Sequence, residues 1–301
     1  WEDSQSAQTE AEQEISEENL EEYALPADGM IIRQMERKGK VSRRTWFALV
    51  LMLLVVPLLL YLSVRYFHGR KYLICSLIVI IAAMIPFFMM FEGRKPKARE
   101  IMVISVLAAI GVAGRAAFFM VPSFKPVAAI VILTGISFGG EAGFLVGCLI
   151  MMLSNMFMGQ GPWTPWQMFC WGCIGFVAGL LVKAGIFGPI GKEQPQKNGK
   201  RKKPIRLCIY GLASGFAYGW VMNLFYIIGY VRPLTWQTVA AAYVSSFFFD
   251  LSHGICTMLV LYFVGEAWIR KLLRIKRKFG LTGEERSYVM PPGRHEEEGT
   301  L

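Results

Sequence analysis

The sequence predicts an all-α integral membrane protein, because its composition, its hydropathy and the lengths of its apolar runs all favour that fold class. Of its 301 residues, 54% are hydrophobic and 18% are charged, and the mean hydropathy is +0.42. This composition is too apolar for an ordinary soluble domain. The net charge of +10 is also compatible with nucleic-acid binding, so the positions of the charges have to decide between the two interpretations.

Eight apolar runs approach the length of about 20 residues that a spanning helix needs. The fourth run is short, and it predicts a tilted or partly buried helix whose ends are covered by other helices. We expect these helices at residues 46–64, 72–91, 101–121, 126–138, 141–158, 166–187, 207–230 and 237–264.

Clusters of basic residues predict the orientation of these helices. Lys and Arg gather at residues 33–44, 94–99, 192–203 and 270–278. If both termini are cytoplasmic, every one of these clusters lies inside, as the positive-inside rule expects. The exception is Arg65, Arg70 and Lys71, which fall in a short outer loop. Membrane topology therefore explains the net charge, and nucleic acid is excluded as a partner.

The remaining composition argues against a disulfide framework, a metal centre or an enzyme. All six cysteines fall inside apolar runs, and the pair Cys170 and Cys173 has no second ligand pair nearby. The three histidines are not paired at ligand spacing, so an integral-membrane enzyme is a poor interpretation. Residues 1–45 are first acidic and then basic, and predict a largely disordered cytoplasmic tail.

Three short outer loops, residues 122–125, 159–165 and 231–236, combine prolines, aromatic residues and polar donors. The second loop and the start of the next helix, "GQGPWTPWQM", contain Gln160, Trp163, Thr164, Trp166 and Gln167. Flat indole rings beside amide and hydroxyl groups suit a ring-bearing solute. Tryptophans also gather at membrane interfaces, which is the competing explanation for this pair. We expect the loop to form part of a small-molecule pocket.

Polar residues inside the expected helices are a second indication of a site, because burying an ionisable group in the bilayer is costly. Arg115, Asn155 and Asn223 lie in the outer halves of their helices, and Asp250 and His253 share one face of the last helix. Two alternatives stay open: Arg115 and Asp250 either pair structurally or contact a substrate. The two asparagines either join helices or line the site. His253 is also a candidate proton carrier.

Small residues recur every four positions on the third expected helix, at Ser105, Ala109, Ala113 and Ala117. Such a ridge lets another helix approach closely. It predicts either packing within the bundle or docking of a partner subunit. The glycine pair in "GFLVG", Gly143 and Gly147, indicates only close packing.

Residues 99–183 resemble the substrate-binding S components of energy-coupling factor (ECF) vitamin importers. The resemblance rests on "REIMVISVLAAIGVAGR", "PSFKPVAAIVILTGISFGGEAGFLVG" and "SNMFMGQGPWTPWQMFCWGCIGFVAGLL". It implies a six-helix bundle that binds a vitamin near its outer face, in the plasma membrane of a prokaryote. It also implies that Ala109, Ala113 and Ala117 face a transmembrane coupling protein (the T component), and that two cytoplasmic ATPases supply energy from ATP. The chain itself then needs no cofactor.

The resemblance divides the chain into the tail 1–45, an extra helix pair at 46–98, the six-helix core at 99–268 and a basic cytoplasmic tail at 269–301. The expected substrate is cobalamin-like, with a pyrimidine or benzimidazole precursor as the next choice. The alternative function is an ion-coupled secondary transporter that uses Asp250 and His253. The candidate binding residues are Arg115, Phe124, Lys125, Asn155, Gln160, Trp163, Thr164, Trp166, Gln167, Asn223, Tyr226, Arg232, Trp236 and Asp250.

Overall fold

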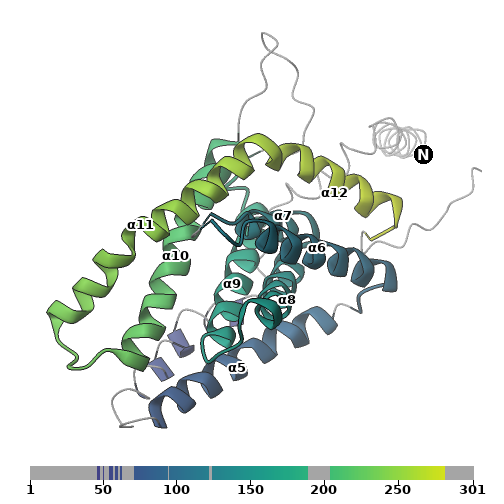
Figure 1. The fold of residues 1–301 in the computed structure, drawn as a ribbon. Helices are drawn as coiled ribbons and strands as arrows, with labels where there is room; N and C mark the ends of the chain where they lie inside the picture. Colours follow the sequence, from purple (N-terminus) through teal and green to yellow (C-terminus); the bar gives the residue numbers. More distant parts are fainter. Residues whose placement is uncertain are drawn as a thin grey trace, which may run out of the picture.

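The computed structural model describes residues 71–93, 95–121, 124–188 and 204–281, together with scattered residues between 46 and 62. These residues form helices and no strand (Figure 1). The helices are α5 (Lys71–Glu92), α6 (Ala98–Ala117), α7 (Val127–Phe138), α8 (Gly140–Met158), α9 (Thr164–Lys183), α10 (Ile205–Tyr230), α11 (Trp236–Val260), the π-helical turn η2 (Leu261–Gly265) and α12 (Glu266–Lys278).

The all-α membrane fold predicted from the sequence is confirmed. Each helix expected between residues 72 and 264 is present within a few residues of its expected bounds. Five helices of the described part are long and apolar enough to cross a membrane, while α7 and the part of α5 from Leu77 to Glu92 are shorter apolar helices. The first expected helix, 46–64, lies largely outside the described residues, and the tail 1–45 lies wholly outside them.

The last helix differs most from its expected length, because α11 continues without a break through η2 and α12. The sequence places the start of a tail at residue 269, whereas the helix runs on to Lys278. The reason is amphipathicity: Ile269, Leu272 and Leu273 are buried and pack into the main core, in which α12 contacts α7. Three basic residues in its last turn match the negative end of the helix dipole.

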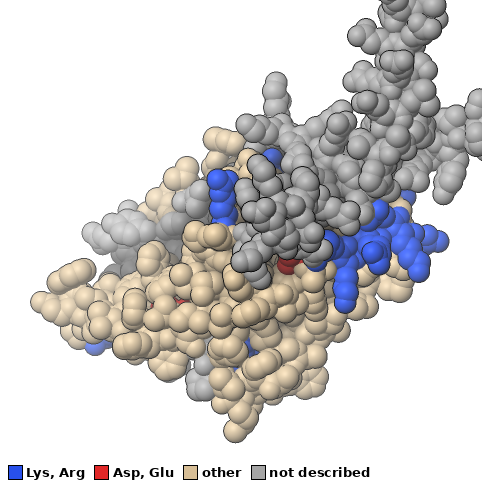
Figure 2. Space-filling view, turned by 90° about the horizontal axis from the view of Figure 1, so that it is seen from above, with Lys and Arg blue, Asp and Glu red and all other residues tan. Residues whose placement is uncertain are grey.

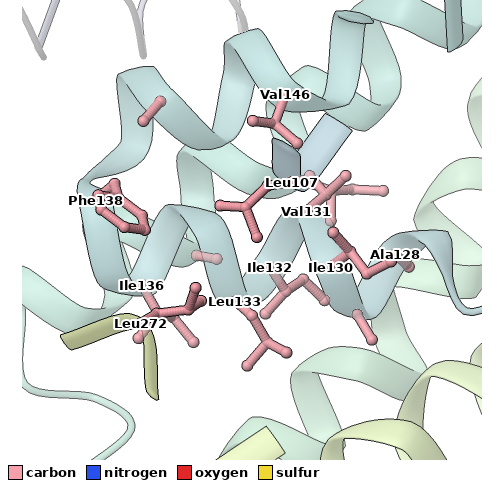
Figure 3. Packing of buried hydrophobic residues seen from close by; sticks show 14 of the residues in the cluster. Leu107, Ala128, Ile130, Val131, Ile132, Leu133, Ile136, Phe138, Val146 and Leu272 are labelled. Atoms are coloured by element: carbon pink, nitrogen blue, oxygen red, sulfur yellow. The ribbon is translucent and has the colours of Figure 1, made fainter. Parts of the chain in front are cut away.

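Helix α7 is the centre of the molecule, and all twelve of its residues are buried. It contacts α6, α8, α9, α10, α11 and α12. Figure 3 shows side chains of α7 packed among Leu107 of α6, Val146 of α8 and Leu272 of α12. A helix enclosed by protein on every side is apolar all round. This explains why the sequence of α7 carries no polar face.

Glycines allow α7, α8 and α9 to meet backbone to backbone. A methyl group on Gly135 would overlap the carbonyl of Gly175, and one on Gly143 would come within 2.7 Å of the Gly135 Cα. Gly147, the second glycine of "GFLVG", lies equally close to the backbone of Trp171. Such close approach is typical of membrane helix interfaces, where small residues let backbones come into contact.

Helices α10 and α11 form a hairpin, of which α10 contacts α9 (Figure 1). Gly215 of α10 lies against the backbone of Gly254 on α11. At the tip, Thr235 caps α11 by accepting a hydrogen bond from the Thr238 amide at 3.3 Å. On another side of the bundle, α5 contacts α8 and α9.

The distribution of charge is the one expected if the helices cross a membrane. In Figure 2 most of the described surface in view is neither acidic nor basic, and Lys and Arg gather at one end of it, where α12 lies. Large apolar side chains are exposed along α6, α10 and α11, among them Val106, Ile209 and Phe248. An apolar belt with basic residues at one end is the pattern that a bilayer requires.

Candidate functional site

A polar pocket of about 240 Å³ lies inside this apolar bundle. It is built where α8, α9, α10 and α11 meet the end of α6, the start of α7 and the loop between them, so residues far apart in the sequence share its wall. The lining residues are Arg115, Lys125, Val127, Met151, Gln167, Trp171, Tyr218 and His253.

Arg115, in the last turn of α6, is held through one of its terminal nitrogens. Nη1 donates to Ser154 Oγ at 2.5 Å and to Asn155 Oδ1 at 2.7 Å, and it lies 3.4 Å from Met151 Sδ. These partners lie on consecutive turns of α8, so the guanidinium joins α6 to α8. All three partners are uncharged.

The hydrogen bonds continue from Arg115 across the pocket wall. Asn155 Nδ2 donates to Thr164 Oγ1 at 3.0 Å and to Gln167 Oε1 at 2.8 Å. Gln167 Nε2 donates in turn to the Tyr218 hydroxyl at 3.1 Å. Four helices, α6, α8, α9 and α10, are therefore connected by one chain of polar side chains, and such networks fix a single geometry when every member is satisfied.

Three rings form the aromatic wall of the pocket. The Trp171 ring lies 4.9 Å from Tyr218 and 5.5 Å from His253, and Tyr218 lies 5.3 Å from His253, measured between ring centroids. His253 is buried, and its Nε2 has no hydrogen-bond partner in the described part of the chain. The Trp171 Nε1 is in the same situation. Buried polar atoms without partners are uncommon and call for an explanation.

Lys125 places a second positive charge at the pocket. It lies in the loop between α6 and α7, outside both helices, and is half-buried. Burial first, and the charge of Arg115 second, hold the pKa of Lys125 below its ordinary value of 10.5. Neither Lys125 nor Arg115 forms an ion pair with a carboxylate of the described residues.

Five of the candidate residues from the sequence come together at this pocket. Arg115, Lys125 and Gln167 line it, while Asn155 and Thr164 are buried directly behind Gln167.

The two tryptophans of the "GQGPWTPWQM" segment lie elsewhere. Trp166 is 1% exposed and lines a separate apolar cavity of about 350 Å³, next to Val56 and Ile80. Trp163 is 37% exposed, and its ring lies against Gly161, which leaves no space for a side chain there. Pro165 lies in the first turn of α9 beside them. The segment thus contributes Thr164 and Gln167 to the polar chain, and its tryptophans lie outside the lining.

Gln160 in the same segment also points away from the lining, because its Nε2 donates to the Met152 carbonyl at 3.1 Å. Phe124 lies in the loop before α7, with its ring 6.0 Å from that of Phe118. Neither residue is part of the pocket wall.

Asn223 and Asp250 join the two helices of the hairpin to each other. Asn223 Nδ2 donates to Ser246 Oγ at 2.6 Å, and Ser246 Oγ donates to Asp250 Oδ2 at 3.0 Å. The carboxylate of Asp250 fills the space above Gly219. The structural pair between Arg115 and Asp250 that the sequence left open is not formed, because each side chain has these other partners.

The remaining candidates lie at the tip of the hairpin. Trp236, at the start of α11, is 77% exposed, and Tyr226 is 52% exposed and stacks on Tyr230. Arg232 donates to the carbonyls of Val231 and, at 3.4 Å, of Ile228. None of the three lines the polar pocket.

Sequence reasoning missed Trp171 and Tyr218 as site residues, along with the apolar lining residues Val127 and Met151. Both rings lie in the middle of apolar runs, where aromatic residues usually serve packing. His253 was considered as a polar residue of the last helix and as a proton carrier, but not among the binding residues, and the structure places it in the wall of the pocket. Within the described residues, no three His, Cys, Asp or Glu side chains lie together in a way that could hold a metal ion.

The small-residue ridge of α6 faces outward. Ser105, Ala109, Ala113 and Ala117 are all exposed, whereas Ile104, Leu107, Ala108 and Gly111 form the buried face of the helix. Packing within the described bundle therefore does not use this ridge.

These observations define a class of protein: a multi-pass α-helical membrane protein with a small polar pocket between its helices. Residues 95–263, more than half of the chain, match the family model described as "ECF-type riboflavin transporter, S component". The chain belongs to this family of transporter S components, which is not a family of enzymes.

The chain is also similar to proteins named UPF0397. A UPF0397 protein of Vibrio atlanticus (strain LGP32) is 30% identical over 144 residues, which cover 46% of this chain and 75% of that relative. UPF0397 proteins of Aliivibrio fischeri (strain MJ11) and Aliivibrio salmonicida (strain LFI1238) are 29% and 32% identical over 102 residues, which cover 30% of this chain and 55% of each relative. No solved structure matches the chain.

Proposed function

We propose that this chain captures a ring-bearing vitamin or vitamin precursor from outside a prokaryotic plasma membrane and holds it in the pocket of Arg115, Gln167 and Trp171. The observation that carries the proposal is the pocket itself. It combines an aromatic wall with a few fixed polar groups inside an otherwise apolar bundle, which is the usual composition of a small-molecule site.

The volume of the pocket bears on the substrate. Its 240 Å³ lies below the roughly 300–1,000 Å³ typical of sites for drug-sized ligands. A pyrimidine, a benzimidazole or the ring system of riboflavin, the vitamin named in the family description, suits this volume better than a corrinoid. A cobalamin-like substrate would require this pocket to enlarge.

Energy for uptake would come from partner subunits. We propose that the outward-facing ridge of Ala109, Ala113 and Ala117 contacts a transmembrane coupling protein, the T component, which works with two cytoplasmic ATPases. The exposure of this ridge along a membrane-spanning helix supports the assignment, because small residues permit close helix contact. Solute would then be released inward when the bundle reorients in the membrane.

Calorimetry on the full chain purified in detergent tests the capture function. The panel contains riboflavin, cobalamin, hydroxymethylpyrimidine and dimethylbenzimidazole, each measured with and without sodium, and with Trp171→Leu alongside. We expect one compound to bind without sodium and to be weakened by the substitution. Absence of binding would overturn the proposal. Sodium-dependent binding that ignores Trp171 would instead favour ion-coupled transport, in which Asp250 and His253 are the groups to test.

A further inference from the structure

We infer that the ligand of this pocket carries an acidic group, a carboxylate or a phosphate ester, which is bound between Arg115 and Lys125 while its ring lies against Trp171. The inference rests on the proposed capture function and adds the chemical class of the ligand. Three independent features of the pocket wall support it: the direction of its hydrogen bonds, its uncompensated charge and its buried atoms without partners.

The first feature is the direction of the hydrogen-bond chain. A guanidinium can only donate, so the Asn155 oxygen has to face Arg115, and the Asn155 amide nitrogen then faces Gln167. The Gln167 side-chain oxygen accepts that hydrogen bond, and the Gln167 side-chain nitrogen donates one to the Tyr218 hydroxyl. The acceptor oxygens of both amides are consequently used inside the wall.

The end of this chain is a donor. Tyr218 accepts from Gln167, and its hydroxyl proton remains available to the pocket. Arg115 uses only Nη1 for the described protein contacts, so its other terminal nitrogen and Nε remain as further donors. The Trp171 indole, which can only donate, is buried beside Tyr218, 4.9 Å away between ring centroids, and makes no hydrogen bond of ordinary geometry in the described chain. A wall that presents donors selects a ligand that presents acceptors.

The second feature is charge. Arg115 and Lys125 bring two positive charges to one small pocket, and the charge of Arg115 disfavours the charged form of Lys125. None of the lining residues is acidic. Asp250, three residues before the lining residue His253, instead accepts a hydrogen bond from Ser246 and lies against Gly219 of α10. A buried charge without a counter-charge is strongly destabilising, so an anionic group on the ligand is the natural complement.

The third feature distinguishes a shaped site from a simple ion site. His253, buried with a partnerless Nε2, lies on the aromatic wall with Trp171 and Tyr218. A small inorganic ion at Arg115 and Lys125 would leave this wall without a partner. A ring that bears an acidic group satisfies both parts of the pocket at once.

Matched pairs of ligands that differ only in an acidic group test the inference. The probes are riboflavin and riboflavin 5′-phosphate, uracil and orotate, and benzimidazole and benzimidazole-5-carboxylate, with inorganic phosphate alone as a further arm. Binding is measured by calorimetry on the full chain in detergent. We expect the acidic member of the pair that fits to bind roughly 10- to 100-fold more tightly than its neutral member, the range expected for hydrogen bonds to charged groups.

Variants of Lys125 show whether this site is responsible. Lys125 makes no hydrogen bond to the described residues, so Lys125→Gln is the variant least disruptive to folding. It should reduce the preference for the acidic member several-fold, because only Arg115 then faces the acidic group, while Lys125→Arg should retain most of it, and an unchanged preference in Lys125→Gln would overturn the inference. Lys271→Gln, which removes an exposed charge on α12, is the matched control and should have no effect.

Each other outcome overturns the inference. If a neutral ring binds as tightly as its acidic partner, the anionic subsite is wrong, although the capture function survives. If inorganic phosphate alone binds as tightly as the acidic rings, the pocket is only an ion site. If no compound of any pair binds, the inference fails together with the capture of these rings.

Discussion

Nη1 of Arg115 on α6 lies 2.7 Å from Oδ1 of Asn155 on α8, and this contact decides the polarity of the whole pocket wall. Because Arg115 is only a donor, Asn155 can direct only its amide nitrogen towards Thr164 and Gln167. One contact between two helices therefore determines which groups remain for a ligand at the other end of the hydrogen-bond chain, at Tyr218.

Replacing Asn155 with Ala should damage both stability and binding. The substitution leaves Gln167 and Thr164 without the Asn155 amide and removes an acceptor from Arg115. We expect a loss of about 1–3 kcal/mol in the free energy of unfolding, the usual cost of an unsatisfied buried group. Tryptophan fluorescence during thermal unfolding measures it. Gln160→Ala, which removes one exposed hydrogen bond, is the control. If the two variants lower the stability equally, the hydrogen-bond chain through Asn155 does not have this role.

The two tryptophans at positions 163 and 171 should respond differently to substitution. Trp171 lines the pocket, and Trp163 lies outside it against Gly161. We expect Trp171→Leu to weaken ligand binding by about tenfold, as for loss of an aromatic contact of 0.5–1.5 kcal/mol beyond burial. Trp163→Ala should change the affinity less than threefold, because residues at the periphery of a binding site contribute little to the binding energy. If calorimetry shows that Trp163→Ala weakens binding more than Trp171→Leu, the ligand binds at the loop of residues 159–165 instead.

The fold was predictable because the bilayer leaves few alternatives. Apolar runs of nearly spanning length have to form helices, since an unpaired backbone is not tolerated in lipid. The continuation of α11 into α12 was not found, because its basic residues resemble a tail. The pattern that reveals it is the spacing of Ile269, Leu272 and Leu273, which becomes meaningful only with α7 as a packing partner.

The site was predictable only in its polar half. Arg115, Asn155 and Gln167 stand out against apolar neighbours, since polar groups in a membrane are expensive. Trp171 and Tyr218 do not stand out, because an aromatic residue has the same neighbours in sequence whether it packs or binds. The orientation of Asp250 was also hidden, since it depends on the empty space over Gly219 in another helix.

Close backbone contact between α7 and α9 predicts that Gly135→Ala is poorly tolerated. The added methyl group would overlap the carbonyl of Gly175, and two packed backbones cannot easily separate. We expect a loss of about 1–3 kcal/mol or more, the cost of overpacking a core, visible as a lower melting temperature in detergent. Gly265→Ala is the control, because its nearest neighbour is a Leu261 side-chain atom at 3.6 Å. An unchanged melting temperature for Gly135→Ala would contradict this packing.

The ridge on α6 can be tested separately from the pocket. Ala109→Trp and Ala113→Trp would place bulky rings on an exposed helix face without touching the core. If the ridge docks the coupling protein, these variants should lose co-purification with it and ATP-dependent uptake, because close helix approach is blocked. Ligand binding in detergent should stay normal. Ala241→Trp, also exposed but on α11, is the matched control, and retained assembly in the α6 variants would place the partner elsewhere.

The lowered pKa of Lys125 predicts how binding of an acidic ligand depends on pH. Lys125 is charged at pH values well below its pKa, and because that pKa lies under 10.5 the charge is lost earlier than on a free lysine as the pH rises. Affinity should therefore be full near neutral pH and decline through the alkaline range towards pH 10.5. Arg115, His253 and Tyr218 also face the pocket, so the wild type alone does not identify the group. Lys125→Arg keeps its charge throughout this range and should remove most of the decline. Calorimetric titrations at neutral pH and at several alkaline values decide the matter: a decline that persists unchanged in Lys125→Arg would assign the titration to another group and leave Lys125 without a role in binding.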